Sequence, residues 1–385
     1  MMKRTFYIVL PIAEVAALYK DPGMIPAVMN DLGYDAHFVS FLRKQDIPPY
    51  AVEFANKIQL ETIELKQKSN TFLPWHSKEI LMYLWKHAKE IDILNLYYLK
   101  HSILYALCYK LRNPHGVLYI KLDLTPDACK KEETDKIAPI RTGVYKWYLQ
   151  HVPDVVSAET VSAVQYVQSR YRIDYPKLLL IPNGIDDKWI QQNNICIAPF
   201  GQRENIILTV GRIGAYDKNN EFMLEALSKT DLKDWKFIFV GKVVDGFEVR
   251  INEFYERNAS LRDKVVFTGE CTDRLKLFEW YNRAKVFCFS SRRESFGIVL
   301  AEAQYFGNYI LSTPVSSLPD FIGEDERLGK AVRSSSGLAC EIQSIVDNQN
   351  DISLSHAVRV EQGQRYAWSR ICRQLKAAFE QGNEI

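Results

Sequence analysis

S-S-R-R-E-S-F-G-I-V-L-A-E-A-Q, residues 290–304, is the stretch of the sequence that most strongly determines the fold we predict. Glu294 comes just before an apolar, helix-like segment, and Glu302 follows eight positions later inside it. Residues 284–291 are β-branched and aromatic without alternation, which is typical of a buried parallel strand. The Ser-Phe-Gly at 295–297 favours a helix start, because serine is a good cap and glycine allows close approach of the backbone. The stretch therefore predicts a strand that leads directly into a helix.

A strand that opens into a helix N-terminus predicts an anion-binding site. Unpaired backbone N–H groups and the helix dipole point at one spot there. At a rise of 1.5 Å per residue, the eight residues from Glu294 to Glu302 span at most ~12 Å. The two carboxylates would accept hydrogen bonds from hydroxyls on either side of a bound phosphate, which fits the two sugars that flank a diphosphate. The spacing alone also arises by chance, so the prediction depends on the strand and helix around it.

Strand-like and helix-like segments alternate along the whole chain, which predicts an α/β fold with parallel sheets and helices on both faces. In the first half, strands are expected near 5–10, 34–40, 58–64, 92–99, 117–123, 154–158 and 178–181. Helices are expected near 23–32, 77–90, 102–111, 134–150 and 161–171. A chain of 385 residues exceeds what one hydrophobic core usually supports, so two domains are predicted, with a polar linker over 182–199.

Composition indicates a soluble cytoplasmic protein. The net charge of +2 and the lack of a basic run argue against nucleic acid as a partner. The seven cysteines are scattered, odd in number and without a C-x-x-C pair, which favours a reducing compartment over disulfides or a zinc site. No segment reaches the ~18 consecutive apolar residues of a membrane span. The basic and apolar residues 1–10 mimic a signal peptide, but the apolar part is short and is expected to form the first strand.

Further segments in chain order carry a resemblance to a known family. Residues 206–213 form a predicted buried strand ending in Gly211 and Arg212, and Lys218 follows in A-Y-D-K-N-N. The others are L-L-L-I-P-N-G-I-D at 178–186, W-K-F-I-F-V-G at 235–241, V-V-F-T-G-E at 265–270 and R-Y-A-W-S at 365–369. Together with residues 290–304 they resemble the retaining glycosyltransferases of the GT-B fold, glycosyltransferase family 4. The C-terminal half matches strongly and the N-terminal half only in outline.

The resemblance implies two Rossmann-like doubly wound domains that face each other across a cleft. Residues 1–185 would bind the acceptor, residues 190–365 the nucleotide sugar, and a C-terminal helix at 366–385 would pack back on the first domain. The implied activity is transfer of a hexosyl unit from a UDP- or GDP-sugar to a glycan or lipid-linked glycan, in bacterial cell-surface polysaccharide synthesis. No cofactor and no metal are expected, since GT-B enzymes generally work without a catalytic metal and no D-x-D triplet occurs here.

The resemblance also assigns roles in the second domain. Arg212 and Lys218 would meet the charge that develops on the departing diphosphate. Glu294 would accept hydrogen bonds from the donor sugar and Glu302 from the ribose. The backbone around the helix start completes the predicted donor site, which consists of Gly211, Ser295, Phe296, Gly297, Ile298 and Glu302. The simpler alternatives are a surface ion pair for Arg212, a local salt bridge for Glu294 with its neighbouring arginines, and a solvated helix carboxylate for Glu302.

The first domain departs from the family pattern. The loop after the first strand lacks the usual pair of glycines, and Lys20, Asp21 and Gly23 are the predicted acceptor contacts. Where many members carry a histidine after the fifth strand, this chain has Y-I-K-L-D-L, so Lys121 and Asp123 are the candidate catalytic groups, with a structural ion pair as an equal alternative.

Three function hypotheses remain at this point. The favoured one is an active transferase at the inner face of the plasma membrane, with peripheral membrane contact left open for the aromatic, basic stretch 145–151. For that stretch, inward packing of the aromatic side chains is the favoured alternative. The other two hypotheses are a GT-B sugar-nucleotide epimerase and a non-catalytic, degenerate transferase subunit.

Overall fold

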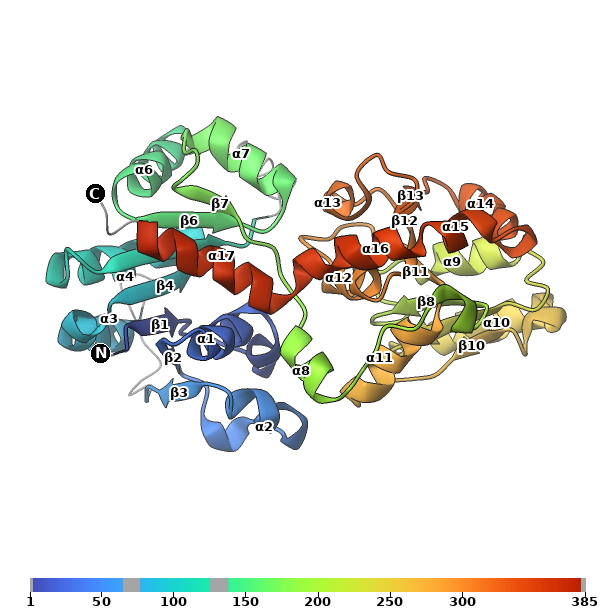
Figure 1. Ribbon diagram of the computed structural model, residues 1–385, viewed down its shortest axis with the longest axis horizontal. Coiled ribbons are helices and arrows are strands. Elements are labelled where there is room, and N and C mark those ends of the chain that lie inside the picture. Colours follow the sequence, from blue (N-terminus) through green and yellow to red (C-terminus); the bar gives the residue numbers. More distant parts are fainter. Residues whose placement is uncertain (1–2, 65–76, 125–137, 382–385) are drawn as a thin grey trace. The chain divides into compact units, whose positions relative to one another are not determined.

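The computed structural model describes residues 3–64, 77–124 and 138–381. They divide into two compact units, residues 1–186 with 368–385 (unit 1) and residues 187–367 (unit 2). Each unit contains one sheet whose paired strands all run parallel, with helices on both faces (Figure 1). The predicted α/β class is therefore confirmed.

Unit 1 has a seven-stranded sheet in the order β3-β2-β1-β4-β5-β6-β7. The strands are β1 Thr5–Val9, β2 Asp35–Ser40, β3 Gln59–Thr62, β4 Ile93–Tyr97, β5 Val117–Leu122, β6 Val155–Ala158 and β7 Leu178–Leu180. The helices are α1 Asp21–Asp31, α2 Pro49–Ala55, α3 Lys78–His87, α4 Leu99–Arg112, α6 Ala138–His151, α7 Val161–Tyr171 and α17 Trp368–Gln381, with the 3₁₀ turns η1 Val15–Tyr19, η2 Lys44–Asp46 and η3 Ala88–Glu90. All seven expected strands occur. The expected strand 92–99 was too long, because the chain turns at Tyr98 and enters α4.

Unit 2 has a six-stranded sheet in the order β10-β9-β8-β11-β12-β13. The strands are β8 Ile206–Val210, β9 Lys236–Val240, β10 Val265–Phe267, β11 Val286–Phe289, β12 Tyr309–Ser312 and β13 Gly329–Ala331. The helices are α8 Asp187–Gln192, α9 Asn220–Leu227, α10 Phe247–Arg257, α11 Arg274–Arg283, α12 Ile298–Tyr305, α13 Leu318–Ile322, α14 Ser335–Asp347, α15 Asn350–Leu354 and α16 His356–Gly363, with η4 Phe200–Gln202, η5 Ala259–Leu261 and η6 Gln364–Tyr366. The expected linker 182–199 is not a plain coil, because it contains α8.

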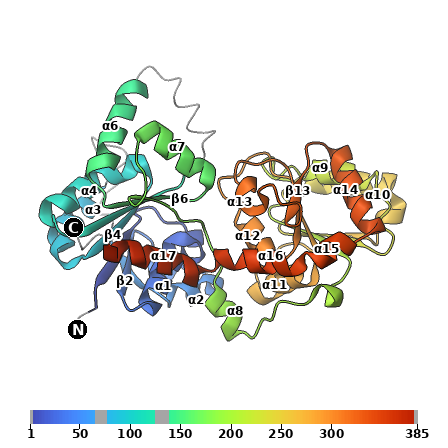
Figure 2. The ribbon, with the colours of Figure 1, turned by 45° about the horizontal axis from the view of Figure 1, so that its top comes forward.

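The sheet of unit 1 is buried on both faces, which explains why its strands are continuously apolar. Successive residues of β1 point to opposite faces: Phe6 lies in the core beneath α1, and Tyr7 lies in the core beneath α3 and α4. Figure 2 shows α3, α4, α6 and α7 on the second of these faces. The alternation along a single strand thus supplies both cores.

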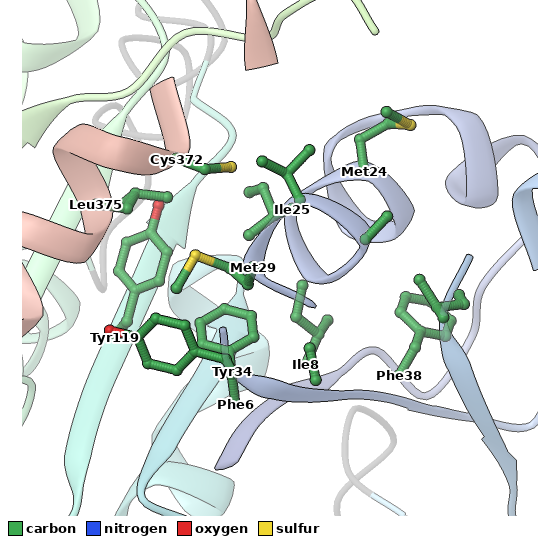
Figure 3. Close-up of a cluster of buried hydrophobic side chains, with 14 of the residues drawn as sticks. Phe6, Ile8, Met24, Ile25, Met29, Tyr34, Phe38, Tyr119, Cys372 and Leu375 are labelled. Carbon is green, nitrogen blue, oxygen red and sulfur yellow. The ribbon is translucent and has the colours of Figure 1, made fainter. Parts of the chain in front are cut away.

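The C-terminal helix α17 completes the first core of unit 1. Its buried residues Cys372, Leu375 and Phe379 recur every three to four positions, as expected for one face of a helix. Figure 3 shows Cys372 directed toward Ile25 of α1 and Leu375 beside Tyr119. The ring of Phe379 lies 6.0 Å from that of Phe6. The helix begins at Trp368, two residues after the predicted start at 366, because residues 364–366 form a separate 3₁₀ turn.

Candidate functional site

The residues predicted to bind the donor follow two neighbouring strands of unit 2. Gly211 and Arg212 come directly after β8, and Ser290 follows β11. Strands β8 and β11 pair in parallel, so these residues share the carboxyl edge of the sheet. In parallel α/β sheets this edge is where ligands bind. Gly211, Arg212, Lys218 and Ser290 line one shallow hollow there.

The helix that starts at this edge is initiated by glycine. Helix α12 begins at Ile298, and Gly297 occupies the N-cap position with φ 86° and ψ 71°. The sequence-based assignment of serine as the cap was wrong, since Ser295 lies two residues further upstream. Glycine suits the position because a side chain is strained at this φ, and a Cβ atom would lie 3.3 Å from Cγ of Glu294. The backbone therefore carries Glu294 close to the first N–H groups of α12.

Glu294 and Lys218 form a tight ion pair. Their side chains are 19% and 21% exposed, and Lys218 Nζ lies 2.7 Å from Glu294 Oε2. The Ser290 hydroxyl donates to the carbonyl of Lys218 at 2.6 Å, which anchors the lysine to the end of β11. The alternative of a local salt bridge between Glu294 and its neighbouring arginines is not what the structure shows. The pair instead joins the loops after β8 and β11.

Arg212 lies on the exposed side of the same edge. Its side chain is 68% exposed and its Nη2 is 3.2 Å from Asp217 Oδ2. An exposed ion pair of this kind contributes little to stability and is readily exchanged for another anion. Arg212 is thus positioned to meet a ligand without first breaking a buried contact.

Glu302 is held by a tyrosine that the sequence did not indicate. The hydroxyl of the fully buried Tyr281, on α11, donates to Glu302 Oε2 at 2.6 Å. Burial raises the pKa of Glu302 to about 7, while the Tyr281 hydrogen bond and the charge of Arg274 oppose that rise. The residue as a whole nevertheless keeps part of its surface exposed.

Two buried arginines hold the opposite end of α12. Arg203 donates from Nη2 to the carbonyl of Phe306, and Arg359 donates from Nε to the carbonyl of Gly307 at 2.9 Å. These carbonyls follow the last turn of α12, where they have no partner within the helix. Among the described residues, neither arginine has a carboxylate within ion-pair distance. The two cations therefore complement the negative end of the helix dipole.

In unit 1, the predicted residues gather at the carboxyl edge of its sheet. Lys121, in β5, has no exposed surface and lies 3.1 Å from Glu159 Oε1 and 3.6 Å from Asp21 Oδ2. These two carboxylates outweigh burial and raise the pKa of Lys121, so the ammonium stays charged. Burial raises the pKa of Glu159 to about 7, and Lys121 opposes the rise. The geometry favours the ion-pair alternative for Lys121, and Glu159 is a member of the site that the sequence did not indicate.

The other predicted residues of unit 1 differ in exposure. Asp123, one position beyond β5, is exposed, yet desolvation by nearby protein and the charge of Asp21 raise its pKa. Lys20 is exposed at the N-cap of α1. Gly23 is buried, and a Cβ atom there would overlap the carbonyl oxygen of Leu18 at 2.1 Å. Gly23 thus lets η1 pack against α1, and Lys20 and Asp123 are the two predicted residues of this edge that are exposed.

Residues 3–64, 77–124 and 138–381 contain no helix long and apolar enough to cross a membrane. Within the same ranges there is no group of three or more His, Cys, Asp or Glu side chains that could hold a metal ion.

Comparisons with known proteins agree with this architecture. Residues 191–362 match the family model described as Glycosyl transferases group 1. The solved structure of Alr3699/HepE from Anabaena in complex with UDP covers 99% of this chain and 100% of its own, with a TM-score of 0.70 at 15% sequence identity. A likeness over nearly the whole chain confirms the GT-B fold.

Curated relatives match parts of the chain. The O-antigen chain mannosyltransferase C of Escherichia coli is 28% identical over 203 residues, which are 51% of each chain. An uncharacterized 41.2 kDa protein in the cps region of Klebsiella pneumoniae is 30% identical over 124 residues, 32% of each chain. This chain thus spans about half or less of the length of these relatives.

Proposed function

We propose that this protein transfers a hexosyl unit from a UDP- or GDP-sugar to a hydroxyl of a glycan or lipid-linked glycan, with retention of anomeric configuration, in bacterial cell-surface polysaccharide synthesis. The Lys218–Glu294 pair beside the glycine-initiated helix α12 carries the proposal. It puts a cation, a carboxylate and helix N–H groups at one sheet edge. The group 1 match over residues 191–362 and the mannosyltransferase relative support it.

In the proposed mechanism, two cations stabilise the leaving group. Breaking the sugar–phosphate bond develops negative charge on the diphosphate. Arg212 would donate two hydrogen bonds to its oxygens, and Lys218 would interact with it as a point charge. Glu294 would orient the donor sugar through its hydroxyls. We propose front-face attack, in which the departing phosphate accepts the proton of the acceptor hydroxyl. No cofactor or metal enters this scheme.

Two kinds of donor are candidates, a UDP-sugar and a GDP-sugar. The Anabaena protein of the same fold was solved with UDP, and the Escherichia coli relative is named a mannosyltransferase. We therefore propose to incubate the protein with UDP-glucose, UDP-galactose or GDP-mannose, each with the methyl glycosides of glucose, galactose and mannose, and to follow the anomeric protons by NMR. A new glycosidic signal with retained configuration is expected from one donor. Epimerised sugar and free nucleotide without an acceptor would instead indicate an epimerase, and no turnover of any donor would favour the degenerate subunit.

Donor affinity is expected to rise with pH through about 7. Below that value Glu302 is protonated, because burial raises its pKa from 4.5 to about 7. Above it, the carboxylate accepts ribose hydroxyls, and a charged acceptor improves a hydrogen bond by about 1 kcal/mol, or roughly fivefold in affinity. Calorimetric titration with a sugar nucleotide from pH 5.5 to 8.5 measures the affinity at each pH. The diphosphate diester of the sugar nucleotide does not titrate in this range, so a change in affinity reports on the protein.

Two variants serve as controls for the pH profile. Glu302→Gln is expected to bind weakly at every pH, with a flat profile. Tyr281→Phe removes a hydrogen bond that favours the carboxylate, so the midpoint should move to higher pH. A profile in Glu302→Gln that matches the wild type would contradict the role of Glu302.

Helix α6 is the proposed site of peripheral membrane contact at the inner face of the plasma membrane. Tyr148 is fully buried, as inward packing predicts, but Ile140, Val144 and Trp147 are 74%, 49% and 52% exposed at helical spacing. The helix carries Arg141 and Lys146 and no acidic residue. An exposed apolar stripe with basic flanks suits an anionic lipid surface.

Flotation with phosphatidylglycerol vesicles tests this contact. The wild-type protein is expected to float with them and not with phosphatidylcholine, and Trp147→Ser should remain in the soluble fraction. The control is Trp85→Ser, which removes a tryptophan of similar exposure (50%) from α3. Equal flotation of all three proteins, or flotation of none of them, would contradict the proposed membrane contact.

A further inference from the structure

Tyr98 has the most strained backbone at the carboxyl edge of unit 1. It is the single residue between β4, which ends at Tyr97, and α4, which starts at Leu99. Its φ of 64° and ψ of 135° belong to a region that bulky residues almost never occupy. Such conformations persist where surrounding structure imposes them, and they gather at functional sites. A sharp strand-to-helix turn of this kind presents a side chain at the top of the sheet.

The surroundings fix the Tyr98 ring without burying it. The backbone N–H of Tyr98 donates to the carbonyl of Lys121 at 3.1 Å, and its ring makes edge contacts with Tyr97 at 6.2 Å and His101 at 6.1 Å. Even so, Tyr98 is 40% exposed. A packed but exposed aromatic ring offers an apolar face at low entropic cost to a ligand.

Hydrogen-bonding groups lie on the neighbouring elements at this edge. Asp123 is two residues beyond Lys121, whose carbonyl accepts from the Tyr98 N–H. Lys121 Nζ lies 3.6 Å from Asp21 Oδ2 and 3.1 Å from Glu159 Oε1. Burial first, and then the charges of Asp123, Asp21 and Glu159, raise the pKa of Tyr98 to about 12. Asp123 is the exposed carboxylate of this group, so it offers an acceptor for a hydroxyl group.

We propose that Tyr98 is the stacking platform for a neutral hexopyranose ring of the acceptor, whose hydroxyls donate to Asp123. The apolar C–H face of a sugar packs on an aromatic ring, and its rim of hydroxyls needs an acceptor such as this exposed carboxylate. A carboxylate beside the ring also favours hydroxyl donors over an anion at this place. The assignment deepens the proposed function, because it names the acceptor subsite of the same reaction and rests on it.

Saturation-transfer NMR with the methyl glycosides of mannose, galactose and glucose as probes tests the platform. Wild-type protein and Tyr98→Phe are expected to saturate the ring protons of at least one glycoside. Tyr98→Gly relieves the backbone and removes the ring, so the signal should fall at least fivefold. Tyr98→Asn keeps a side chain on the backbone, as tyrosine does, but removes the ring, so it should behave as Tyr98→Gly does, which covers a folding failure of either variant. Tyr50→Ala, which removes an exposed tyrosine from α2, should leave the signal unchanged.

The same samples separate this inference from the proposed function. Their melting temperatures are measured with and without UDP and GDP, whose site we place in unit 2. Undiminished glycoside signal in Tyr98→Gly and Tyr98→Asn, or no signal with the wild type, overturns the platform even when a nucleotide shifts the melting temperature. Loss of the signal in both variants, with the nucleotide shift kept, supports it. If glycoside binding requires Tyr98 but neither nucleotide changes the melting temperature, the result supports the platform and contradicts the donor site in unit 2.

Discussion

Lys218→Met is expected to lower the transfer rate by about 10²–10³-fold, the usual loss on removing one preorganised group that stabilises developing charge. Lys218 is 21% exposed and its Nζ lies 2.7 Å from Glu294 Oε2, so water screens it poorly. The rate is measured with saturating acceptor in the NMR assay. The variant should stay folded, because the pair joins loops at the sheet edge and does not belong to the core.

Two further variants make this prediction specific. Lys233→Met removes a lysine whose ion pair with Asp347 is as short, at 2.6 Å, but lies on the surface away from the edge, and its rate should not change. The double variant Lys218→Met/Glu294→Gln distinguishes two roles of the lysine when the affinity for UDP or GDP is measured, because neither nucleotide carries the sugar that Glu294 would orient. If Lys218 only neutralises Glu294, the double variant recovers the wild-type affinity; if Lys218 meets the diphosphate, the affinity stays low. Recovery, or wild-type turnover in Lys218→Met, would remove Lys218 from the mechanism.

Arg359→Met is expected to cause the largest loss of stability, about 3 kcal/mol of the free energy of unfolding. The guanidinium has no exposed surface and donates to the backbone carbonyls of Gly307, Arg327 and Ile352. Each carbonyl left without a donor costs about 1–3 kcal/mol. Part of this is offset, because burial also disfavours the charge and lowers the pKa of Arg359 to about 9.

Thermal unfolding measures the effect of Arg359→Met. For a unit of this size, ~1 kcal/mol corresponds to ~2–4 °C, so the melting temperature of unit 2 should fall by ~6–12 °C. Arg327→Met is the control, because its guanidinium is 63% exposed and, among the residues that the structure describes, forms its ion pair with Asp325 at the surface. It should change the stability by less than ~0.5 kcal/mol. A melting temperature of Arg359→Met within 2 °C of the control, by the same scale, would show that water replaces the guanidinium.

The strands of unit 1 could be predicted because their residues are buried on both faces of a parallel sheet, whereas the short helices α2 and α8 were not expected. Such strands are continuous apolar runs, and polar turn residues separate them from helices. The errors lie where the backbone departs from repetitive structure. The strand expected over 92–99 contains no turn residue that would predict the turn at Tyr98. Serine is a common helix cap, which favours Ser295 at this position, whereas the cap is Gly297.

The partners within the sites could not be predicted, for a different physical reason. Arg212, Lys218, Glu294 and Glu302 were identified by motif, but their contacts join distant segments. Lys218 meets Glu294 because β8 and β11 are neighbours in the sheet, although 76 residues separate the two side chains. Helical or strand periodicity contains no information on sheet order. For the same reason, no pattern along the chain indicated that Tyr281 would lie beside Glu302 or Glu159 beside Lys121.

Calorimetric titration of UDP and of GDP into the protein, without added metal, tests the central claim that unit 2 holds a nucleotide diphosphate at the edge formed by β8, β11 and α12. We expect one of the two to bind with one site per chain. Lys218→Met should weaken that binding at least tenfold, since a hydrogen bond to a charged group contributes about 1.5–3 kcal/mol, and Lys233→Met should not. Binding of neither nucleotide, or equal affinity in all three proteins, would contradict the assignment of this edge as the donor site.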